Sequence, residues 1–325
     1  MSEKRNLRGT IVRAFISAAI LFWLSAKVEW SEIGRVFADC RWDIFALGLV
    51  PVLMIRFLTA YKWQLLIEAK GEKVGYRHLL WSVWVSNFLG SFLPATAGGD
   101  AVRMYSLGAS SGRHAEAVSS VAMDRITGAV SMMVAAFVGA LWAAIVWGRN
   151  EVLIVMAAPA FAVAAMVAFL IVPGLQNLAD KILNRFNAFP GIKLIREAYS
   201  ALCDYKEHGR ILGVVFALAL MNQLMRVLIV WSLAKSTSMS LSFADCAILV
   251  PPALLVSMLP ISIAGWGVRE GALVYFLNIA GAAAPAIFAV ALLMRLLIGI
   301  GNLPGVFMYL KSGLNLKVRR SYAVS

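Results

Sequence analysis

Two short segments of nearly the same sequence interrupt apolar stretches in the two halves of the chain. Residues 93–103 read LPATAGGDAVR and residues 259–269 read LPISIAGWGVR, with identical residues at five of the eleven positions. Each segment combines proline, glycine and charge, which break a helix and free backbone groups that lipid cannot satisfy. At membrane depth such a break is tolerated only inside protein or beside water. Paired breaks in two halves of a membrane protein are typical of a transport site.

The composition places most of the chain in a membrane. Hydrophobic residues make up 61% of the 325 residues, charged residues make up 14%, and the mean hydropathy is +0.79. A soluble domain of this size could not bury so much apolar surface. Because a spanning helix takes about 20 residues, the chain has no room for a sizeable soluble domain. The net charge of +13 then predicts basic loops beside anionic lipid, and no nucleic-acid partner is expected.

The pattern of apolar segments and basic loops predicts the topology. The apolar segments are Thr10–Ala26, Trp42–Ile67, Tyr76–Leu93, Ala117–Trp147, Val152–Val172, Ile211–Ala234, Phe243–Leu259 and Ala283–Leu310. Each repeated motif adds a short apolar tail, Val102–Leu107 or Gly271–Ala280, which is too short to span a bilayer. Lysine and arginine gather at both termini and in residues 68–78 and 176–210. These parts should therefore be cytoplasmic, and the less basic connections should face outward.

These loop positions require the chain to leave and re-enter the same side around each motif. We therefore expect two re-entrant helical hairpins that enter from opposite sides, with tips near 94–100 and 260–270. The predicted fold is an all-α polytopic membrane protein with about six spanning helices and the two hairpins in an inverted-topology repeat. The single transmembrane domain, 1–325, would contain a peripheral signal-anchor helix at 10–26, repeat 1 at 42–147, a connecting helix at 152–172, a cytoplasmic amphipathic segment at 176–210 and repeat 2 at 211–310.

The segment 176–210 has apolar residues at helical spacing on both sides of Pro190-Gly191. This pattern predicts a pair of amphipathic helices. Two placements remain open, one on the inner leaflet with basic residues toward lipid phosphates, and one as a solvated linker.

Charged residues inside the membrane segments are the candidates for a binding site. Six arginines fall there with only three acids, and an arginine facing lipid costs roughly 2.5–3.5 kcal/mol at the bilayer centre. The side chains must therefore turn toward partners or water, and the surplus of positive charge favours an anionic ligand such as a phosphate. The predicted headgroup-binding residues are Arg56, Asp100, Arg103, Asp124, Arg125, Arg226, Arg269, Glu270 and Arg295, and the predicted helix-break residues are Pro94, Gly98, Gly99, Pro260, Gly265 and Gly267.

The arginines are not equivalent in this interpretation. Arg103 and Arg269 follow glycines, at the start of a half-helix that presents unpaired N–H groups and the positive end of its dipole. They are the strongest candidates for the site. Arg56, Arg226 and Arg295 have an alternative role, in which they extend to an interface or pair with helix carbonyls.

Enzymatic and metal chemistry have little support in the sequence. The histidines (His78, His114, His208) and cysteines (Cys40, Cys203, Cys246) are scattered without metal-ligand spacing, and no nucleophile or phosphate-loop motif is present. We therefore expect no cofactor, no metal and no catalytic residue. An intramembrane enzyme stays open as an alternative, since Asp100, Asp124 or Glu270 could act as a general base.

The two motifs resemble those of a known family. They are Leu93-Pro94, Gly98-Gly99-Asp100 and Arg103 in the first half, and Pro260, Gly265-Trp266-Gly267-Val268 and Glu270 in the second. In these residues the chain resembles the transmembrane-region family of lysylphosphatidylglycerol synthases, a flippase-like family, over most of its length. The Asp124-Arg125 pair is similar to an acid–arginine pair that follows the first hairpin in relatives. The resemblance implies a membrane domain that moves lipids or lipid-linked intermediates between leaflets.

One departure from the family limits what the resemblance implies. Members that synthesise lysyl-lipid carry a soluble C-terminal aminoacyl transferase, whereas this chain ends at Ser325 soon after its last helix. We therefore expect no synthase activity.

The predicted function is a flippase-like protein of a bacterial-type inner membrane, with both termini cytoplasmic. It would bind or move an anionic phospholipid or a polyprenyl phosphate. The alternative is a non-transporting accessory scaffold of envelope lipid or glycan biosynthesis. The oligomeric state is left open, with a homo-oligomer among the alternatives.

Overall fold

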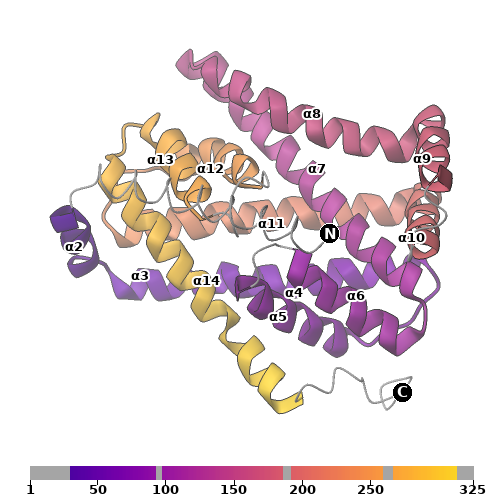
Figure 1. Cartoon of the computed structure of the whole chain (residues 1–325). Helices are drawn as coiled ribbons and strands as arrows, with labels where there is room; N and C mark the ends of the chain where they lie inside the picture. Colours follow the sequence, from indigo (N-terminus) through magenta and orange to yellow (C-terminus); the bar gives the residue numbers. More distant parts are fainter. Residues whose placement is uncertain (1–29, 93–96, 186–191, 259–265, 313–325) are drawn as a thin grey trace, which may run out of the picture.

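The computed structural model describes residues 30–92, 97–185, 192–258 and 266–312 (Figure 1). Over these ranges all regular structure is helical and no strand is present, which confirms the all-α prediction. The expected helix at 10–26 and the proline ends of both motifs, 93–96 and 259–265, lie outside the described residues.

The helices of the first half follow the predicted apolar segments. They are α2 (Trp30–Ala38), α3 (Trp42–Leu47), α4 (Leu49–Ala69), α5 (Tyr76–Phe92), α6 (Ala97–Ser111) and α7 (His114–Trp147). The short helix α2 was not predicted, because its sequence falls in a connection expected to face outward. The short apolar tail after the first motif lies within α6.

The second half follows its predicted segments in the same way. Its helices are α8 (Glu151–Ile171), α9 (Pro173–Arg185), α10 (Ile192–Cys203), the 3₁₀ helix η1 (Asp204–His208), α11 (Gly209–Ser236), α12 (Phe243–Ser257), α13 (Val268–Asn278) and α14 (Ala284–Ser312). Helices α9 and α10 occupy the segment with amphipathic periodicity, at the right-hand edge of Figure 1. Their position on the inner leaflet stays a prediction.

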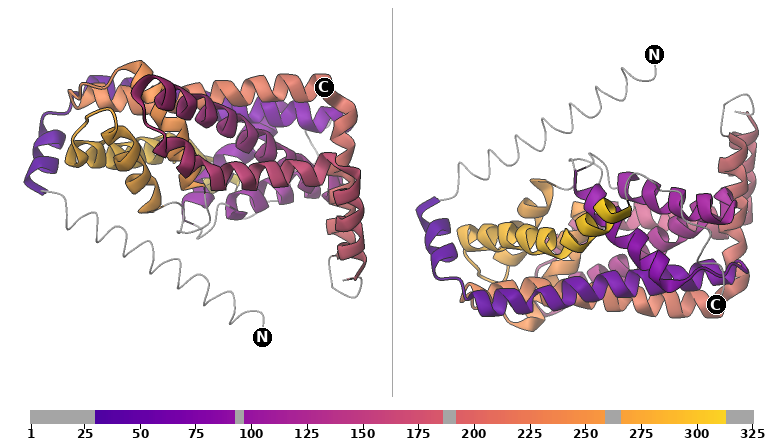
Figure 2. Two further views of the ribbon diagram at one scale, coloured as in Figure 1. Left: turned by 90° about the horizontal axis from the view of Figure 1, so that it is seen from above. Right: turned by 90° about the horizontal axis from the view of Figure 1, so that it is seen from below.

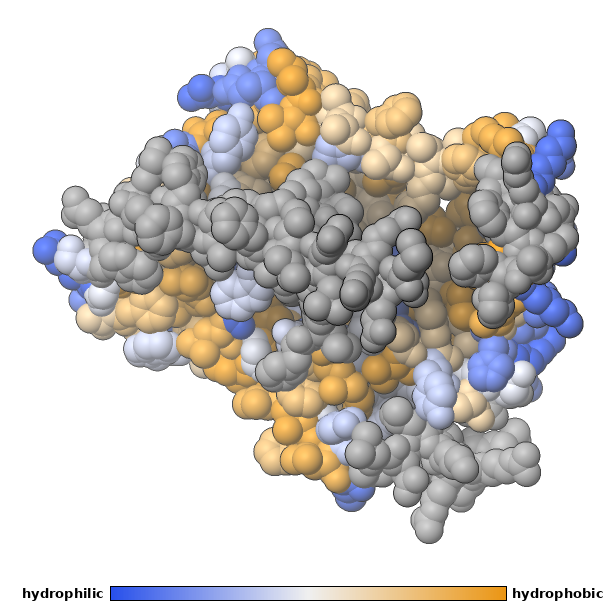
Figure 3. All heavy atoms as spheres, viewed as in Figure 1, coloured by the Kyte–Doolittle hydropathy of each residue, from blue (hydrophilic) through white to orange (hydrophobic). Residues whose placement is uncertain are grey.

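Several helices have the length and composition of membrane spans. In the described ranges five helical stretches qualify: Trp42–Ala69, His114–Trp147, Glu151–Ile171, Ile192–Ser236 and Ala284–Lys311. Large apolar side chains such as Ile145, Ile154 and Phe161 are exposed on them, as expected for surfaces that contact lipid. Figure 3 shows that most strongly hydrophilic residues on the visible face lie near its edges. The chain therefore has the features of a polytopic membrane protein.

Helices α4 and α11 pack side by side in opposite directions at the junction of the two halves. The Arg41 backbone N–H, just before α3, donates to the Ser236 carbonyl at the end of α11 over 2.8 Å. At the opposite end, the Tyr205 hydroxyl in η1 donates to the Leu66 carbonyl near the end of α4 over 2.9 Å. Each helix therefore starts beside the end of the other (Figure 2).

The two halves also exchange contacts reciprocally. Helix α12 of the second half packs on α7 of the first, and α5 of the first half packs on α14 of the second. Likewise α11 packs on α7, and α4 packs on α14. Within each half a short helix pair packs together, α5 with α6 and α12 with α13. This arrangement brings together the helices that carry the charged residues, α4, α6, α7, α11, α13 and α14.

Candidate functional site

In the first half, an acid at the start of α6 forms an ion pair with an arginine of α7. Asp100 lies in the first turn of α6, where the helix dipole favours a negative charge. The Arg125 Nε and Nη2 atoms donate to its two carboxylate oxygens over 2.8 and 2.7 Å. Such a bidentate pair fixes both the distance and the plane of the guanidinium. It therefore ties the start of α6 to the following long helix.

The second half contains a similar pair between α13 and α14. Glu270 lies in the first turn of α13 and is fully buried. The Arg295 Nε donates to its Oε1 over 2.5 Å, and the Gly267 N–H donates to its Oε2 over 2.7 Å. The Arg295 guanidinium also lies 3.8 Å from the centre of the Trp266 ring, a cation–π contact.

The charged residues of the two halves align with one another, but in a different register from the alignment of the repeated motif. Both acid–arginine pairs are 25 residues apart along the chain. Arg56 precedes Asp100 by the same number of residues as Arg226 precedes Glu270. The motif alignment, in contrast, places Glu270 opposite Met104, about one helical turn beyond Asp100. The ion pairs therefore identify Asp100 and Glu270 as structural counterparts.

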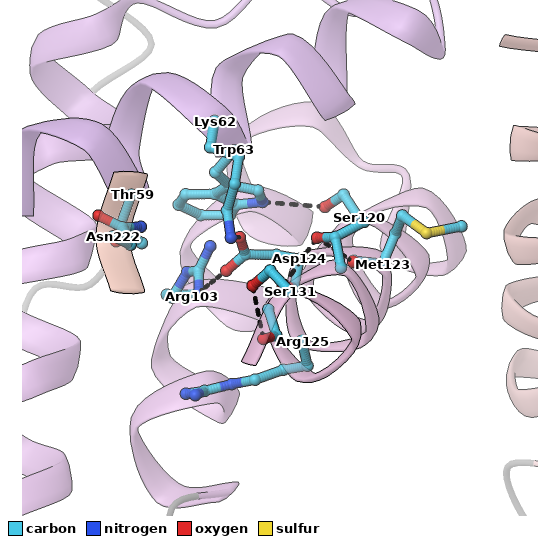
Figure 4. A network of polar contacts seen from close by, with 12 residues as sticks. Thr59, Lys62, Trp63, Arg103, Ser120, Met123, Asp124, Arg125, Ser131 and Asn222 are labelled. Carbon is cyan, nitrogen blue, oxygen red and sulfur yellow. Dashed lines mark hydrogen bonds and ion pairs between the residues drawn. The ribbon is translucent and has the colours of Figure 1, made fainter. Parts of the chain in front are cut away.

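A third acid, Asp124 of α7, holds two cations at once (Figure 4). Its Oδ1 lies 2.9 Å from the Lys62 Nζ, and its Oδ2 accepts a hydrogen bond from the Arg103 Nη1 over 2.8 Å. The Arg103 guanidinium lies 4.2 Å from the centre of the Trp63 ring, and all three charged side chains are buried. Arg125, the next residue along α7, points away from this group toward Asp100.

Lys62 was not among the predicted residues. It lies within the apolar segment Trp42–Ile67, and a lysine in such a segment is the signal that could have found it. Lys62 changes the charge balance of this group, because Lys62 and Arg103 share the carboxylate of Asp124. With Lys62 included, the charged residues of the membrane helices discussed above number seven positive and three negative, a surplus of four.

Arg226 and Arg269 differ from the other arginines of this cluster, because they have neither a carboxylate nor an amide partner among the described residues. Neither forms a hydrogen bond or ion pair with another described residue, and the Nε atom of each is buried. Arg226 lies within electrostatic range of Arg56, Arg125 and Arg269. The arginines of both halves thus converge on Arg226.

Arg56 is bound by neutral groups. Its Nη1 donates to the Asn87 side-chain oxygen over 2.8 Å, and its Nη2 donates to the Asn302 side-chain oxygen over 2.9 Å. These amides position the guanidinium but do not cancel its charge. Arg56 therefore adds to the positive potential around Arg226.

Arg103 and Arg269 have different partners in the structure, although the two residues align in the repeated motif. Arg103 is held by Asp124 and lies 3.9 Å from an Asp100 oxygen. Arg269 forms no ion pair with a described residue, and the acid within electrostatic range of it, Glu270, is already bound to Arg295. A cation outside an ion pair is the better anion receptor, because an ion pair would have to be broken before Arg103 could bind a ligand.

The structure explains why two of the predicted helix-break positions are occupied by glycine. A Cβ added to Gly99 would meet the Ser86 carbonyl oxygen at 2.6 Å, so glycine lets the start of α6 pack against α5. Gly267 adopts φ +82° immediately before α13, a backbone region that favours glycine. Gly98 lies beside Gly99 in the first turn of α6. Pro94, Pro260 and Gly265 lie outside the described residues.

We expect Gly267→Ala to destabilise the protein by about 1–2 kcal/mol, the cost of a side chain in the left-handed backbone region. Equilibrium unfolding in mixed detergent micelles measures the change. Gly213→Ala is the matched control, because Gly213 lies inside α11 with open space around it. That control should be neutral or slightly stabilising. Equal destabilisation by both variants would contradict the assignment of strain to Gly267.

Comparison with known proteins identifies the family of the chain. Within the described ranges, no three histidine, cysteine or acidic side chains are grouped to hold a metal ion. No curated protein matches the chain at a significant level. The family model described as the lysylphosphatidylglycerol synthase TM region matches residues 10–305, nearly the whole chain. The chain, with its paired helix breaks and intramembrane arginines, therefore belongs to the lysylphosphatidylglycerol synthase TM-region family.

Proposed function

We propose that this protein binds the anionic headgroup of a lipid inside the membrane and moves that lipid between leaflets. The observation that carries the proposal is the pair Arg226 and Arg269, partly buried cations whose Nε atoms are buried and which have no ion pair with a described residue. A buried charge without a partner is costly, so it is retained where a function requires it. A phosphate headgroup would supply the missing negative charge.

The chemistry of the site favours phosphate over a simple carboxylate. Guanidinium groups bind phosphate oxygens through two parallel N–H donors and stay charged at any physiological pH. Arg56 and Arg125 lie within electrostatic range of Arg226 and would add to the attraction for a headgroup. An anionic phospholipid and a polyprenyl phosphate both satisfy these requirements. In either case the partner is a membrane lipid, and a homo-oligomer would leave this binding mode unchanged.

The proposal includes an inverted-topology repeat. Three observations support it: α4 and α11 run in opposite directions, the halves exchange contacts reciprocally, and both acid–arginine pairs have the same spacing. In this arrangement the pairs α5–α6 and α12–α13 are re-entrant hairpins that approach the membrane centre from opposite sides. Each side of the membrane would then have its own route to the arginines, as a transporter requires.

The proposed role is not enzymatic. Asp100, Asp124 and Glu270 are the acids of this site, and each is held in an ion pair with a cationic side chain. A carboxylate in such a pair is a weak general base, because the neighbouring cation stabilises its charged form. We also place the protein in a bacterial-type inner membrane with both termini cytoplasmic, on the basis of its basic loops.

The test is lipid transfer by the purified protein in liposomes. The protein should accelerate transbilayer movement of fluorescent anionic lipids, such as phosphatidylglycerol, phosphatidic acid or a polyprenyl phosphate, relative to protein-free liposomes. Phosphatidylcholine is the control lipid, since its headgroup carries no net negative charge. Failure to accelerate any anionic lipid in this panel would refute the proposal.

A further inference from the structure

An apolar groove, lined by none of the arginines described above, lies between α4 and α14. Its volume is about 500 Å³, which is within the usual range of small-molecule pockets. The groove is open to the surroundings, because Leu303 and Phe307 on its wall are exposed. All its lining residues are apolar: Leu49, Leu53, Ile300, Gly301, Leu303, Pro304, Phe307 and Met308.

The local sequence explains why the helices separate here. At Gly301 the two helices are in close contact, since an added Cβ would meet the Val52 Cγ1 at 2.5 Å. Pro304 then lies inside α14, where it removes a backbone hydrogen bond and favours a bend. The groove lies around these two residues.

The groove borders a polar group that leads toward the arginine cluster. Leu53 lines the groove, and Arg56 is three residues further along the same face of α4. Arg56 bonds to Asn302, which stands between the groove residues Gly301 and Leu303. Arg56 is also within electrostatic range of Arg226. The groove therefore leads to Arg56, and Arg56 leads to Arg226.

We propose that this groove holds a hydrocarbon chain of the same anionic lipid whose headgroup binds at Arg226 and Arg269. The inference rests on the proposed function and adds a second contact region for the ligand. An open apolar groove in a membrane is filled by some lipid in any case, because lipid tails surround it. Occupancy by the tail of the bound lipid differs in one respect: it depends on the headgroup site.

Photochemical labelling tests this dependence. Phosphatidic acid with a diazirine in its acyl chain is reconstituted with the protein in phosphatidylcholine nanodiscs, and labelled positions are mapped by mass spectrometry. We expect labelling at Leu303 and Phe307, and a several-fold decrease in the double variant Arg226→Gln/Arg269→Gln. Labelling around Leu296 is the internal control, since Leu296 lies on the same helix and is 46% exposed against 49% for Leu303. Labelling there should not change.

The outcomes separate the possible occupants. Labelling of the groove that is equal in both proteins would mean that bulk lipid fills it, which overturns the inference. Absence of labelling at Leu303 and Phe307, with normal labelling at Leu296, would mean that another occupant, such as a segment of this chain, excludes lipid. This result also overturns the inference.

A groove-filling variant distinguishes failure of the groove from failure of the headgroup site. Leu303→Trp should lower phosphatidic acid binding several-fold while binding of glycerol 3-phosphate, which has no tail, is unchanged. Leu296→Trp, on the same helix, should change neither. If wild-type protein bound no glycerol 3-phosphate, and groove labelling was equal in the wild type and in Arg226→Gln/Arg269→Gln, the headgroup assignment would fail and the inference with it. Unchanged lipid binding in Leu303→Trp would refute the groove alone.

Discussion

Asp124→Asn is expected to destabilise the protein by about 3–5 kcal/mol, the typical cost of breaking a buried ion pair by removing one partner. The carboxylate of Asp124 is the acidic partner within hydrogen-bond distance of both Lys62 and Arg103, at 2.9 and 2.8 Å. Asparagine keeps the shape but leaves two buried cations without that charge. Arg103 has one other acid nearby, Asp100 at 3.9 Å, which is already held by Arg125.

Equilibrium unfolding in mixed detergent micelles measures this effect. The control is Glu151→Gln, which removes an exposed ion pair with Arg149 and should cost less than about 1 kcal/mol. Combining Asp124→Asn with Lys62→Met should recover part of the lost stability, because one of the two unpaired cations is then absent. A loss below 1 kcal/mol for Asp124→Asn alone would contradict the role assigned to the Lys62–Asp124–Arg103 group.

Arg226→Gln and Arg269→Gln are expected to weaken binding of an anionic headgroup about 10- to 100-fold each. The reason is the loss of a charge-assisted hydrogen bond, about 1.5–3 kcal/mol. Stability should be unchanged or slightly higher, since neither arginine has an acidic partner to lose among the described residues. Removing a buried unpaired charge also removes its desolvation cost. This combination of lost binding and retained stability is the signature of a ligand site.

Binding of phosphatidic acid to the purified variants, measured by native mass spectrometry, gives the affinities, and the same unfolding assay gives the stabilities. Arg149→Gln, on an exposed connection, is the control for loss of a positive charge alone and should bind lipid normally. Arg103→Gln provides the opposite contrast, since it should destabilise the protein by leaving Asp124 with Lys62 alone. If Arg226→Gln and Arg269→Gln instead unfolded the protein, their role would be structural, and the scaffold alternative would be favoured.

The sequence was sufficient for the helices and for the membrane setting. Each predicted apolar segment in the described ranges is helical, with Trp42–Ile67 divided between α3 and α4. About 20 consecutive apolar residues leave the backbone no other way to satisfy its hydrogen bonds in lipid. The repeated motif also marked the starts of α6 and α13, which begin inside it at Ala97 and Val268. The short helix α2 was missed, because nine residues with mixed charge carry little signal. The assigned sides of the membrane stay predictions.

The residue types of the candidate site could be predicted from the sequence, but the ion pairs between them could not. Intramembrane arginines can be read from the sequence, since each is exceptional inside an apolar run. The motif alignment made Arg103 and Arg269 equivalent, whereas the structure gives Arg103 an acid on α7 and leaves Arg269 without one in the described chain. Lys62, the residue that shares Asp124 with Arg103, was missed for the same reason: its importance comes from its neighbour on another helix.

Sequence by itself determined what is local: helix positions, helix breaks and the excess of positive charge in the membrane. Tertiary structure decided which charges cancel, because ion pairing depends on contacts between different helices, such as Lys62 of α4 with Asp124 of α7. A guanidinium that is bound to a carboxylate must break that pair to bind a ligand, whereas one outside an ion pair keeps its donors available. Helix packing sets that difference, and it is why Arg226 and Arg269, and not Arg103, are the expected anion receptors.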